Sequence, residues 1–253
     1  MGLNVKKITA QEKRGNIMLK SFQLNYHYGI TPPKENGFAI KDVFINAEPG
    51  YITCLLGKNA AGKTTLLSLL YGMLRPKSGK VSWDGKEVKY KNLAAYHREV
   101  AYFGEKWCAE GLTVEKNVEM LSILYPTFDR ELFDSLIKTA QAEGTLEKRY
   151  FELSTGERVK AELAFLLARK PKLIILDEPL ANIDPVFKMD ILELLQKGVA
   201  ENGTGVLIST HLIDEISDMV DYIYVLDNGK IVKHGSRFEL MGDGEGTLRE
   251  VLN

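Results

Sequence analysis

The amino-acid sequence predicts an α/β protein whose parallel sheet is interrupted along the chain by a helical insert. A strand, a glycine-rich loop and a helix follow one another around Gly57–Thr64. From Lys172 onward, apolar strand-like runs alternate with helical segments, which is typical of a parallel sheet covered by helices. Between these two parts, residues 108–170 contain three segments with helical spacing of apolar residues. We therefore expect one α/β core and an inserted helical subdomain.

Length and composition are those of a globular protein with a sizeable core. The chain has 253 residues, of which 45% are hydrophobic and 26% charged. Its 33 basic and 34 acidic residues give a net charge of −1. A general nucleic-acid binder normally carries a basic surplus, so we expect no nucleic-acid partner. Cys54 and Cys108 lie in unrelated contexts, and we expect both to be packing residues in a reducing compartment.

The sequence offers no candidate for a membrane span or a secretory signal. Its apolar runs fall far short of the ~20 residues that a spanning helix needs. The first twenty or so residues mix Lys, Gln, Glu and Arg and lack an apolar signal region. We therefore expect a cytosolic chain, unless a partner holds it at a membrane.

Strands are expected to dominate the first part of the chain. β-branched and aromatic residues alternate there, and Pro and Gly at positions 31–37 predict a loop between two of the runs. Leucines between Leu66 and Leu74 give the helix after the glycine-rich loop a wide apolar face. The strands are predicted over Ile17–Tyr26, Ala39–Asn46, Tyr51–Leu56, Lys80–Trp83 and Val100–Phe103.

Helices are expected in the middle of the chain, over Val114–Leu124, Glu131–Glu143 and Gly156–Arg169. Asp129 is a candidate N-cap of the second helix, because its carboxylate can accept a hydrogen bond from a free amide group of the first turn.

The last part of the chain returns to βα alternation. An apolar strand after Lys172 is followed by a helix that Asp184 and Pro185 open, as N-cap and first helical residue. A further strand is predicted over Gly205–Ser209. Two strands over Asp221–Asp227 and Lys230–His234 flank Asn228-Gly229, a strong signal for a type I′ hairpin.

The segment Gly57–Thr64, here called the phosphate loop, fits the pattern G-x-x-x-x-G-K-[ST] in full. Glycines allow tight turns and close backbone approach, so that amide groups and the helix N-terminus can face phosphate oxygens. The alternative is a chance glycine turn before a helix, which the strand–loop–helix context disfavours. The pattern predicts that Lys63 binds the β- and γ-phosphates of ATP and that Thr64 binds Mg²⁺. The predicted nucleotide contacts are Gly57, Asn59, Ala60, Ala61, Gly62, Lys63, Thr64 and Thr65.

Two carboxylates end the apolar run Leu173–Leu176. Such a run predicts a strand buried on both faces of a parallel sheet, and ligands of these sheets bind at the carboxyl ends of the strands. Asp177 is therefore a candidate Mg²⁺ ligand, and Glu178 a candidate catalytic base for the attacking water. The alternative, a solvated acidic turn before Pro179, is less favoured beside an intact phosphate loop.

Further segments carry a family resemblance. Leu153-Ser154-Thr155-Gly156-Glu157 resembles the LSGGQ signature of ATP-binding-cassette (ABC) ATPases. Tyr28 stands where that family has an aromatic residue that stacks on adenine, and Glu105 where it has the Q-loop glutamine. Leu180–Asp184 resembles the D-loop, and Ser209-Thr210-His211 ends in the position of the switch histidine. The resemblance covers roughly residues 17–240, with the segments in the family order.

The resemblance implies a fold and a division of the chain. It implies a P-loop NTPase core of ABC type with a mixed sheet, an N-terminal antiparallel β-subdomain and an inserted α-helical subdomain. We expect one ABC ATPase domain over 1–253. Within it, 1–16 form a polar tail, 17–106 and 171–253 the nucleotide-binding core, and 107–170 the helical subdomain with the signature.

The resemblance also implies a site shared by two copies. In ABC ATPases, the phosphate loop of one subunit and the signature of another enclose each ATP. Ser154, Gly156 and Glu157 of one copy would then face the γ-phosphate held by the other, with Asp184 across the same interface. The implied catalytic residues are Glu178, His211 and Lys63, the implied metal ligands Thr64, Asp177 and Glu105, and Tyr28 the adenine contact.

Several of these residues have structural alternatives. Tyr28 could be a strand-end aromatic residue of a core, and His211 an ordinary residue at a helix start. Asp184 could act only as an N-cap. Ser154 could cap its helix, but this interpretation coincides with the functional one, because a helix N-terminus aimed at an anion is how the family uses that cap.

The chain departs from the family pattern at Ala60, Thr155, Glu157 and Glu105. Ala60 replaces a glycine, which is tolerable if that position does not need a positive φ, and it is the first place to look for strain. Ser154, Gly156, Glu178 and His211 are kept, so we expect a competent ATPase.

The resemblance implies a partner in the membrane. We expect a second ABC ATPase subunit, identical or related, and a separate transmembrane permease that docks on the helical subdomain and the Glu105 region at the cytoplasmic face of a bacterial membrane. Trp107 is a candidate contact there; core packing is the alternative. Leu124–Asp129 contributes to a resemblance to exporters of drugs or of antimicrobial or amphipathic peptides. The rival hypotheses are a soluble ABC ATPase in assembly or nucleic-acid work, and a regulatory module without turnover.

Overall fold

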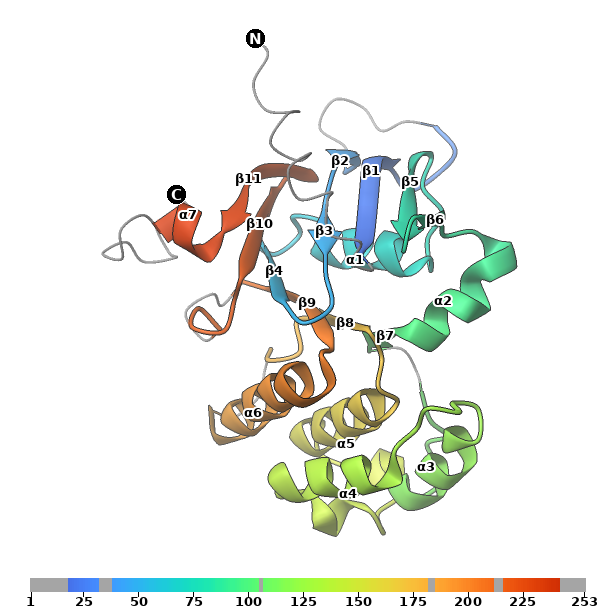
Figure 1. Cartoon of the computed structure of the whole chain (residues 1–253). Helices are drawn as coiled ribbons and strands as arrows, with labels where there is room; N and C mark the ends of the chain where they lie inside the picture. Colours follow the sequence, from blue (N-terminus) through green and yellow to red (C-terminus); the bar gives the residue numbers. More distant parts are fainter. Residues whose placement is uncertain (1–17, 32–37, 105–106, 182–184, 212–215, 242–253) are drawn as a thin grey trace.

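The computed structural model of the protein describes residues 18–31, 38–104, 107–181, 185–211 and 216–241. Figure 1 shows strands in its upper and central part and the helices α3 and α4 at the bottom. The strands are β1 (Leu19–Tyr26), β2 (Ile40–Val43), β3 (Asn46–Ala47), β4 (Ile52–Leu56), β5 (Ser78–Trp83), β6 (Lys86–Glu87), β7 (Val100–Phe103), β8 (Leu173–Asp177), β9 (Gly205–Thr210), β10 (Tyr222–Asp227) and β11 (Lys230–Ser236). The helices are α1 (Lys63–Tyr71), α2 (Leu93–Glu99), α3 (Val114–Ser122), α4 (Arg130–Thr139), α5 (Thr155–Ala168), α6 (Pro185–Asn202) and α7 (Arg237–Met241), with 3₁₀ turns η2 (Tyr90–Asn92), η3 (Glu143–Thr145) and η4 (Tyr150–Glu152).

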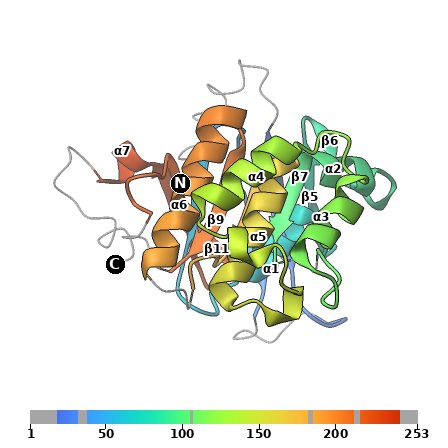
Figure 2. The same cartoon turned by 90° about the horizontal axis from the view of Figure 1, so that it is seen from below.

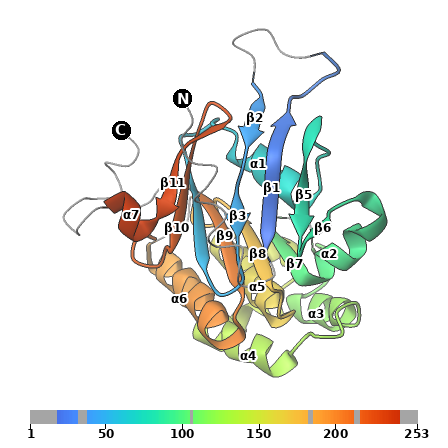
Figure 3. The same cartoon turned by 45° about the horizontal axis from the view of Figure 1, so that its top comes forward.

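The described strands form two sheets. An antiparallel sheet has the order β2-β1-β5-β6, with β3 also paired to β1, and Figure 3 shows β1, β2 and β5 side by side. The second sheet has the order β11-β10-β4-β9-β8-β7. Its strands β10, β4, β9, β8 and β7 are parallel, and β11 pairs antiparallel with β10. The predicted mixed sheet, N-terminal antiparallel sheet and helical insert are thus confirmed.

The parallel strands are buried on both faces, which explains why they are continuous apolar runs. On one face, Leu55, Ile175 and Leu207 pack with α1 and the antiparallel sheet. On the other face, Ile174 and Ile208 pack with α5 and α6. Figure 2, seen from below, shows α4, α5 and α6 together in front of the sheet.

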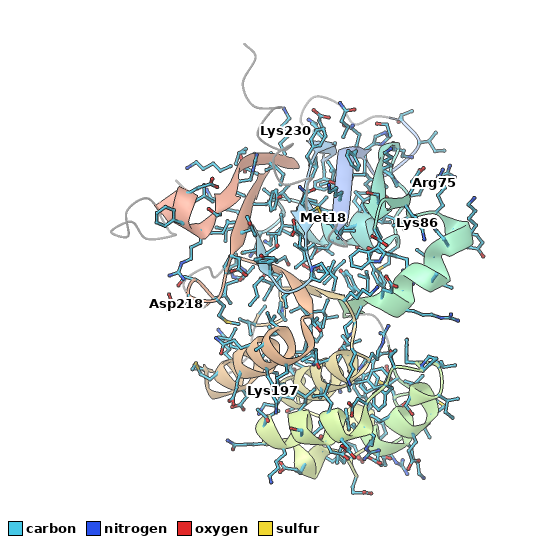
Figure 4. The ribbon with its side chains drawn as sticks, viewed as in Figure 1. Met18, Arg75, Lys86, Lys197, Asp218 and Lys230 are labelled. Atoms are coloured by element: carbon cyan, nitrogen blue, oxygen red, sulfur yellow. The ribbon has the colours of Figure 1, made fainter. Side chains whose placement is uncertain are left out.

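The helical insert is built around a buried aromatic core. Asp129 is the N-cap of α4, as predicted, and its Oδ1 accepts a hydrogen bond from the backbone N–H of Leu132 at 2.9 Å. Trp107 stacks on Phe165 of α5, with ring centroids 4.6 Å apart, so it packs against the core of the insert. Lys197, labelled on α6 in Figure 4, donates a hydrogen bond to Ser135 Oγ of α4 at 3.0 Å.

A buried ion pair also joins α5 to α6. Lys160 is almost fully buried, and its Nζ lies 2.5 Å from Asp190 Oδ2 and 2.7 Å from the carbonyl oxygen of Ala140, to which it donates. Removing one partner of such a pair leaves an uncompensated buried charge. The pair therefore holds the two helices in one relative position.

Glu99 is a second polar anchor, at the end of α2. Its Oε2 accepts from Trp83 Nε1 at 2.6 Å, and its Oε1 pairs with Lys172 Nζ at 3.1 Å. Burial raises the pKa of Glu99, but the hydrogen bonds from Trp83 and Lys172 outweigh it, and the pKa is lowered overall. The carboxylate therefore ties α2 to both sheets in its ionised form.

Two differences from the sequence-based prediction have local causes. The single strand predicted over Ala39–Asn46 is divided into β2 and β3. Ser21 Oγ lies at the break, donating to the carbonyl of Val43 at 3.1 Å and accepting from the N–H of Ile45 at 2.9 Å. Helix α2 was not predicted, because Tyr96 is its one buried residue and an apolar period is therefore missing.

Other expectations are confirmed. Asn228 and Gly229 have φ values of 46° and 75°, as a type I′ turn requires. Cys54 and Cys108 are free and buried. Burial, with a smaller effect of the Glu178 charge, raises the pKa of the Cys54 thiol, so it stays protonated. Among the described residues, no helix has the length and apolar character of a membrane span.

Candidate nucleotide site

The phosphate loop leaves β4 and enters α1 through a backbone that is packed against a neighbouring strand. A Cβ added at Gly57 would lie 2.5 Å from the carbonyl oxygen of Leu226 in β10, so a side chain there forces the backbone to move. Gly62 is the N-cap of α1 with φ 107°, a conformation that favours glycine. Both glycines are therefore required by geometry, and the loop can bring its amide groups close to a phosphate.

Lys63 is directed back across this loop. Its side chain is only 6% exposed, and Nζ donates to the carbonyl oxygens of Gly57 at 2.7 Å and Lys58 at 3.2 Å. The same Nζ lies 2.9 Å from Glu178 Oε1. The buried ammonium is therefore held at the centre of the loop by oxygen atoms, and phosphate oxygens could replace some of them.

Ala60 adopts the left-handed conformation, with φ 64°. The position therefore does need a positive φ. An alanine in place of the family's glycine is unfavourable there, because its Cβ clashes with the backbone in this conformation. The loop therefore contains a strained residue at the position where the sequence departs from the family pattern.

The carboxyl ends of three neighbouring strands bring the remaining polar groups together. Strand β9 lies between β4 and β8, and Ser209 of β9 is in register with Asp177 of β8. Glu178 follows β8 with φ 47°, a positive value rare for a residue other than glycine, Asn or Asp. Its Oε2 lies 2.9 Å from His211 Nδ1, and its Oε1 pairs with Lys63. The structure thus joins Lys63, Glu178 and His211 in one chain of contacts.

Ser209 is a site residue that sequence reasoning did not assign. Its Oγ donates to Asp177 Oδ1 at 2.6 Å and accepts from the N–H of Glu178 at 3.0 Å. One hydroxyl therefore orients both carboxylate residues. The available signal was its place two residues before His211, at the end of the strand adjacent to β8.

Tyr28 lies beside the loop and outside the core. Its side chain is 59% exposed, and its hydroxyl lies 3.0 Å from Thr65 Oγ1 in the first turn of α1. Its ring contacts Tyr26 edge to face, with centroids 5.2 Å apart, and lies 5.9 Å from the ring of Phe38. Of the two alternatives for Tyr28, the buried strand-end residue does not fit this exposure.

The segment resembling the signature caps α5. Ser154 Oγ accepts from the N–H of Glu157 at 3.2 Å, and Glu157 Oε2 accepts from the N–H of Ser154 at 2.8 Å, which is a capping box. Gly156 is buried in the first turn and Thr155 is exposed. Among the described residues, no hydrogen bond or ion pair connects Ser154, Gly156 or Glu157 with the phosphate loop. Two further predicted site residues, Glu105 and Asp184, lie outside the described residues.

The residues at the loop suit a magnesium–nucleotide complex. Asp177 offers a carboxylate oxygen and Thr64 an exposed hydroxyl, which are the oxygen ligands that Mg²⁺ prefers. In the described part of the chain, no group of three His, Cys, Asp or Glu residues forms a metal site.

Comparison with known families shows to which family the chain belongs. Residues 40–181 match the family described as ABC transporter, which is more than half of the chain. The chain belongs to this family as an ATP-binding subunit, which hydrolyses ATP, binds it with Mg²⁺ and works with a membrane component.

Individual relatives agree with this assignment. The energy-coupling factor transporter ATP-binding protein EcfA2 of Ligilactobacillus salivarius is 31% identical over 248 residues, covering 94% of this chain and 85% of the relative. The molybdenum import ATP-binding protein ModC of Paramagnetospirillum magneticum is 30% identical, covering 80% of this chain and 57% of the relative. The structure of cbiO1 from Clostridium perfringens, part of the ABC transporter complex cbiONQ, is 27% identical with a TM-score of 0.74, covering 93% of this chain and 94% of that chain.

Proposed function

We propose that this transporter ATPase hydrolyses ATP at the site formed by Lys63, Glu178 and His211, and that ATP closes it into a dimer which drives a separate transmembrane subunit. The observation that carries the proposal is the contact chain of Lys63, Glu178 and His211 at the ends of three adjacent structural elements. These are the groups that phosphoryl transfer to water needs: a cation, a base and a polar residue beside the base.

Each residue has a proposed role. Lys63 binds the β- and γ-phosphates, and Asp177 and Thr64 hold the Mg²⁺, whose charge offsets that of the phosphates. Glu178 orients the attacking water and accepts its proton at a carboxylate oxygen, once phosphate oxygens have taken its place beside Lys63. His211, which bonds Glu178 Oε2, orients that carboxylate and reports whether the γ-phosphate is present.

The second half of the site is proposed to come from another copy or a related chain. The N-terminus of α5, with its Ser154 cap, is a local anion-binding group because of its free amide groups and helix dipole. We place it, with Gly156 and Glu157, against the γ-phosphate held by the partner. Tyr28 stacks on the adenine, and Asp184 and Glu105 complete the interface and the metal site.

The helical subdomain is the proposed docking region for the transmembrane subunit. Met120 in the last turn of α3, and Ile123 and Leu124 directly after its end, are exposed apolar residues close together in the sequence. Ile123 is 81% exposed, which disfavours a role in the core of the insert. Asn117, fully buried, donates from Nδ2 to the carbonyls of Ala109 and Thr113 at 3.0 Å, and so gives the loop before α3 a defined shape.

Docking and catalysis can be tested separately. When the tagged chain is purified from native membranes, a polytopic membrane protein should co-purify with it. If no such protein co-purifies in repeated experiments, the proposed docking at the cytoplasmic face is refuted. Glu178→Gln should abolish ATP turnover while ATP binding remains, since the loop is unchanged. Glu193→Gln, an exposed acidic position on α6, is the matched control and should keep turnover. Normal turnover in Glu178→Gln would contradict the assigned base.

We propose export of drugs or amphipathic peptides as the direction of transport. The basis is the resemblance to exporter ATPases, to which the segment Leu124–Asp129 contributes. Import is the second candidate, favoured by the name of the molybdenum relative. Membrane vesicles that contain the complex separate the two. In inside-out vesicles, ATP should drive uptake of a labelled amphipathic peptide if the complex exports. ATP-dependent release of molybdate preloaded into these vesicles, without peptide uptake, would instead support import.

A further inference from the structure

Glu157 connects the helix cap of α5 to a lysine from another segment. Its Oε2 accepts from the N–H of Ser154, and its own N–H donates to Ser154 Oγ. Its other oxygen, Oε1, lies 2.7 Å from Lys148 Nζ. The carboxylate thus has one oxygen on the cap and one on the lysine.

The charge of Glu157 is unfavourable for a group that must face a phosphate. The hydrogen bond from Lys148, followed by the one from the Ser154 backbone, lowers the pKa of Glu157, so this carboxyl is ionised at neutral pH. An anion there repels the triphosphate and offsets the positive end of the helix dipole. The ABC signature has a neutral glutamine at this position. The negative charge of Glu157 in this chain therefore has to be balanced by a nearby cation, whereas a glutamine needs no such balance.

Lys148 is held in place by its backbone. Its carbonyl oxygen accepts from the N–H of Val114 at 3.1 Å, and its N–H donates to the carbonyl of Thr145 at 3.1 Å. The next residue, Arg149, forms a β-bridge with Thr113. The side chain is 46% exposed. Lys148 therefore combines a fixed backbone with an ammonium group that remains accessible beside the cap.

We propose that Lys148 is a positioning residue of the shared ATP site: it neutralises Glu157, so that the start of α5 can receive the γ-phosphate of ATP bound by a second copy. This inference rests on the proposed dimerisation with ATP. It adds a residue outside the signature segment, and it makes Lys148 necessary only because position 157 is a glutamate.

A second lysine–cap pair in the same subdomain serves as a matched control. Asp129, the N-cap of α4, accepts from Leu132 with one oxygen, and its other oxygen lies 2.8 Å from Lys170 Nζ. Lys170 is 45% exposed, nearly the same as Lys148. Both lysines therefore balance the acidic residue of a helix cap, but only Lys148 adjoins the segment that resembles the signature.

The experiment measures ATP-dependent dimerisation of the full chain in the Glu178→Gln background, by sedimentation at a series of protein concentrations. Lys148→Met should weaken the dimer roughly tenfold, because each of two sites then presents an uncompensated carboxylate to a triphosphate. In a Glu157→Gln background, Lys148→Met should change the dimer affinity by less than about threefold. Lys170→Met should leave it unchanged. The urea midpoints of the monomeric Lys148→Met and Lys170→Met variants should agree, which excludes general destabilisation.

Three results would overturn the inference. Lys148→Met could dimerise as tightly as the unchanged chain, or Lys170→Met could weaken the dimer equally. The effect of Lys148→Met could also persist in the Glu157→Gln background, and Lys148 would then act through another group. If the Glu178→Gln chain itself does not dimerise with ATP, the proposed dimer of two copies fails before any role of Lys148 is tested, and this distinguishes the two failures.

Discussion

Ala60→Gly tests whether the phosphate loop stores backbone strain. Ala60 has φ 64°, whereas the next residue, Ala61, is not among the residues with positive φ. Ala60 is also exposed, so removing its methyl group costs little packing. The substitution therefore changes mainly the backbone preference at one position of the loop.

The expected magnitude follows from two opposing terms. A residue with a Cβ in the left-handed region costs roughly 1–2 kcal/mol, and glycine relieves this. Glycine also increases the entropy of the unfolded chain, which costs about 0.4–1 kcal/mol. The net gain in the free energy of unfolding is about 0.5–1 kcal/mol. With a urea m-value of about 2–3 kcal/mol/M, the midpoint should rise by about 0.3 M.

The assay is urea unfolding of the nucleotide-free chain, followed by circular dichroism. Ala61→Gly is the matched control: Ala61 is buried and its carbonyl accepts from the N–H of Gly229 at 3.0 Å. There glycine relieves no strain and removes a packed methyl group, so the midpoint should fall by a similar amount. If Ala60→Gly lowers the midpoint as Ala61→Gly does, Ala60 is not strained and the argument from its φ value is refuted.

Three further substitutions test other parts of the structure. Ser209→Ala removes the hydroxyl that orients Asp177, so turnover at saturating ATP should fall about 10–100-fold while the urea midpoint changes little; unchanged turnover would show that the hydroxyl is dispensable. Asp190→Asn leaves Lys160 buried without its counter-charge and should lower the free energy of unfolding, measured in urea titrations, by about 3 kcal/mol. A loss under about 0.5 kcal/mol would contradict the conclusion that this ion pair holds α5 on α6. The folded pKa of Glu99 lies below its ordinary value of 4.5, so its stabilising effect is present above that pH and is lost as the pH falls through the folded pKa. Glu99→Gln should therefore reduce the fall of the urea midpoint between neutral pH and about pH 3. If the pH dependence of the midpoint is the same in the variant, the pKa of Glu99 is not lowered by folding.

The parts of the fold that sequence could predict are those with local physical causes. The glycines and lysine of the phosphate loop, the continuous apolar run of β8 and the Asn228-Gly229 turn each determine their backbone from a few neighbouring residues. The parallel order of β4, β9 and β8, with β9 in the middle, brings the site residues at their carboxyl ends to one edge of the sheet.

The parts that sequence could not predict depend on side-chain contacts between different elements or loops of the fold. Ser209 becomes a site residue only because β9 lies in register beside β8, with Asp177 opposite it. Lys148 pairs with Glu157 because the loop before η4 returns past the start of α5. The only sequence signal for Ser209 was its place two residues before His211, and neither contact leaves a periodic pattern in the sequence.

Positive φ values occur both at the site and elsewhere in the fold, for example at Gln23, Gln141 and Lys170. Among the described residues with positive φ, Asn228 lies in a hairpin, where that conformation is ordinary. Ala60 and Glu178 both lie near Lys63: its Nζ bonds the carbonyl of Lys58, two residues before Ala60, and the carboxylate of Glu178 itself. Such conformations persist where surrounding contacts over-determine them, and they concentrate at functional sites. Ala60 was recognisable in the sequence as a departure from the pattern, but the sign of its φ, which decides whether the departure matters, comes from the three-dimensional arrangement around Lys63.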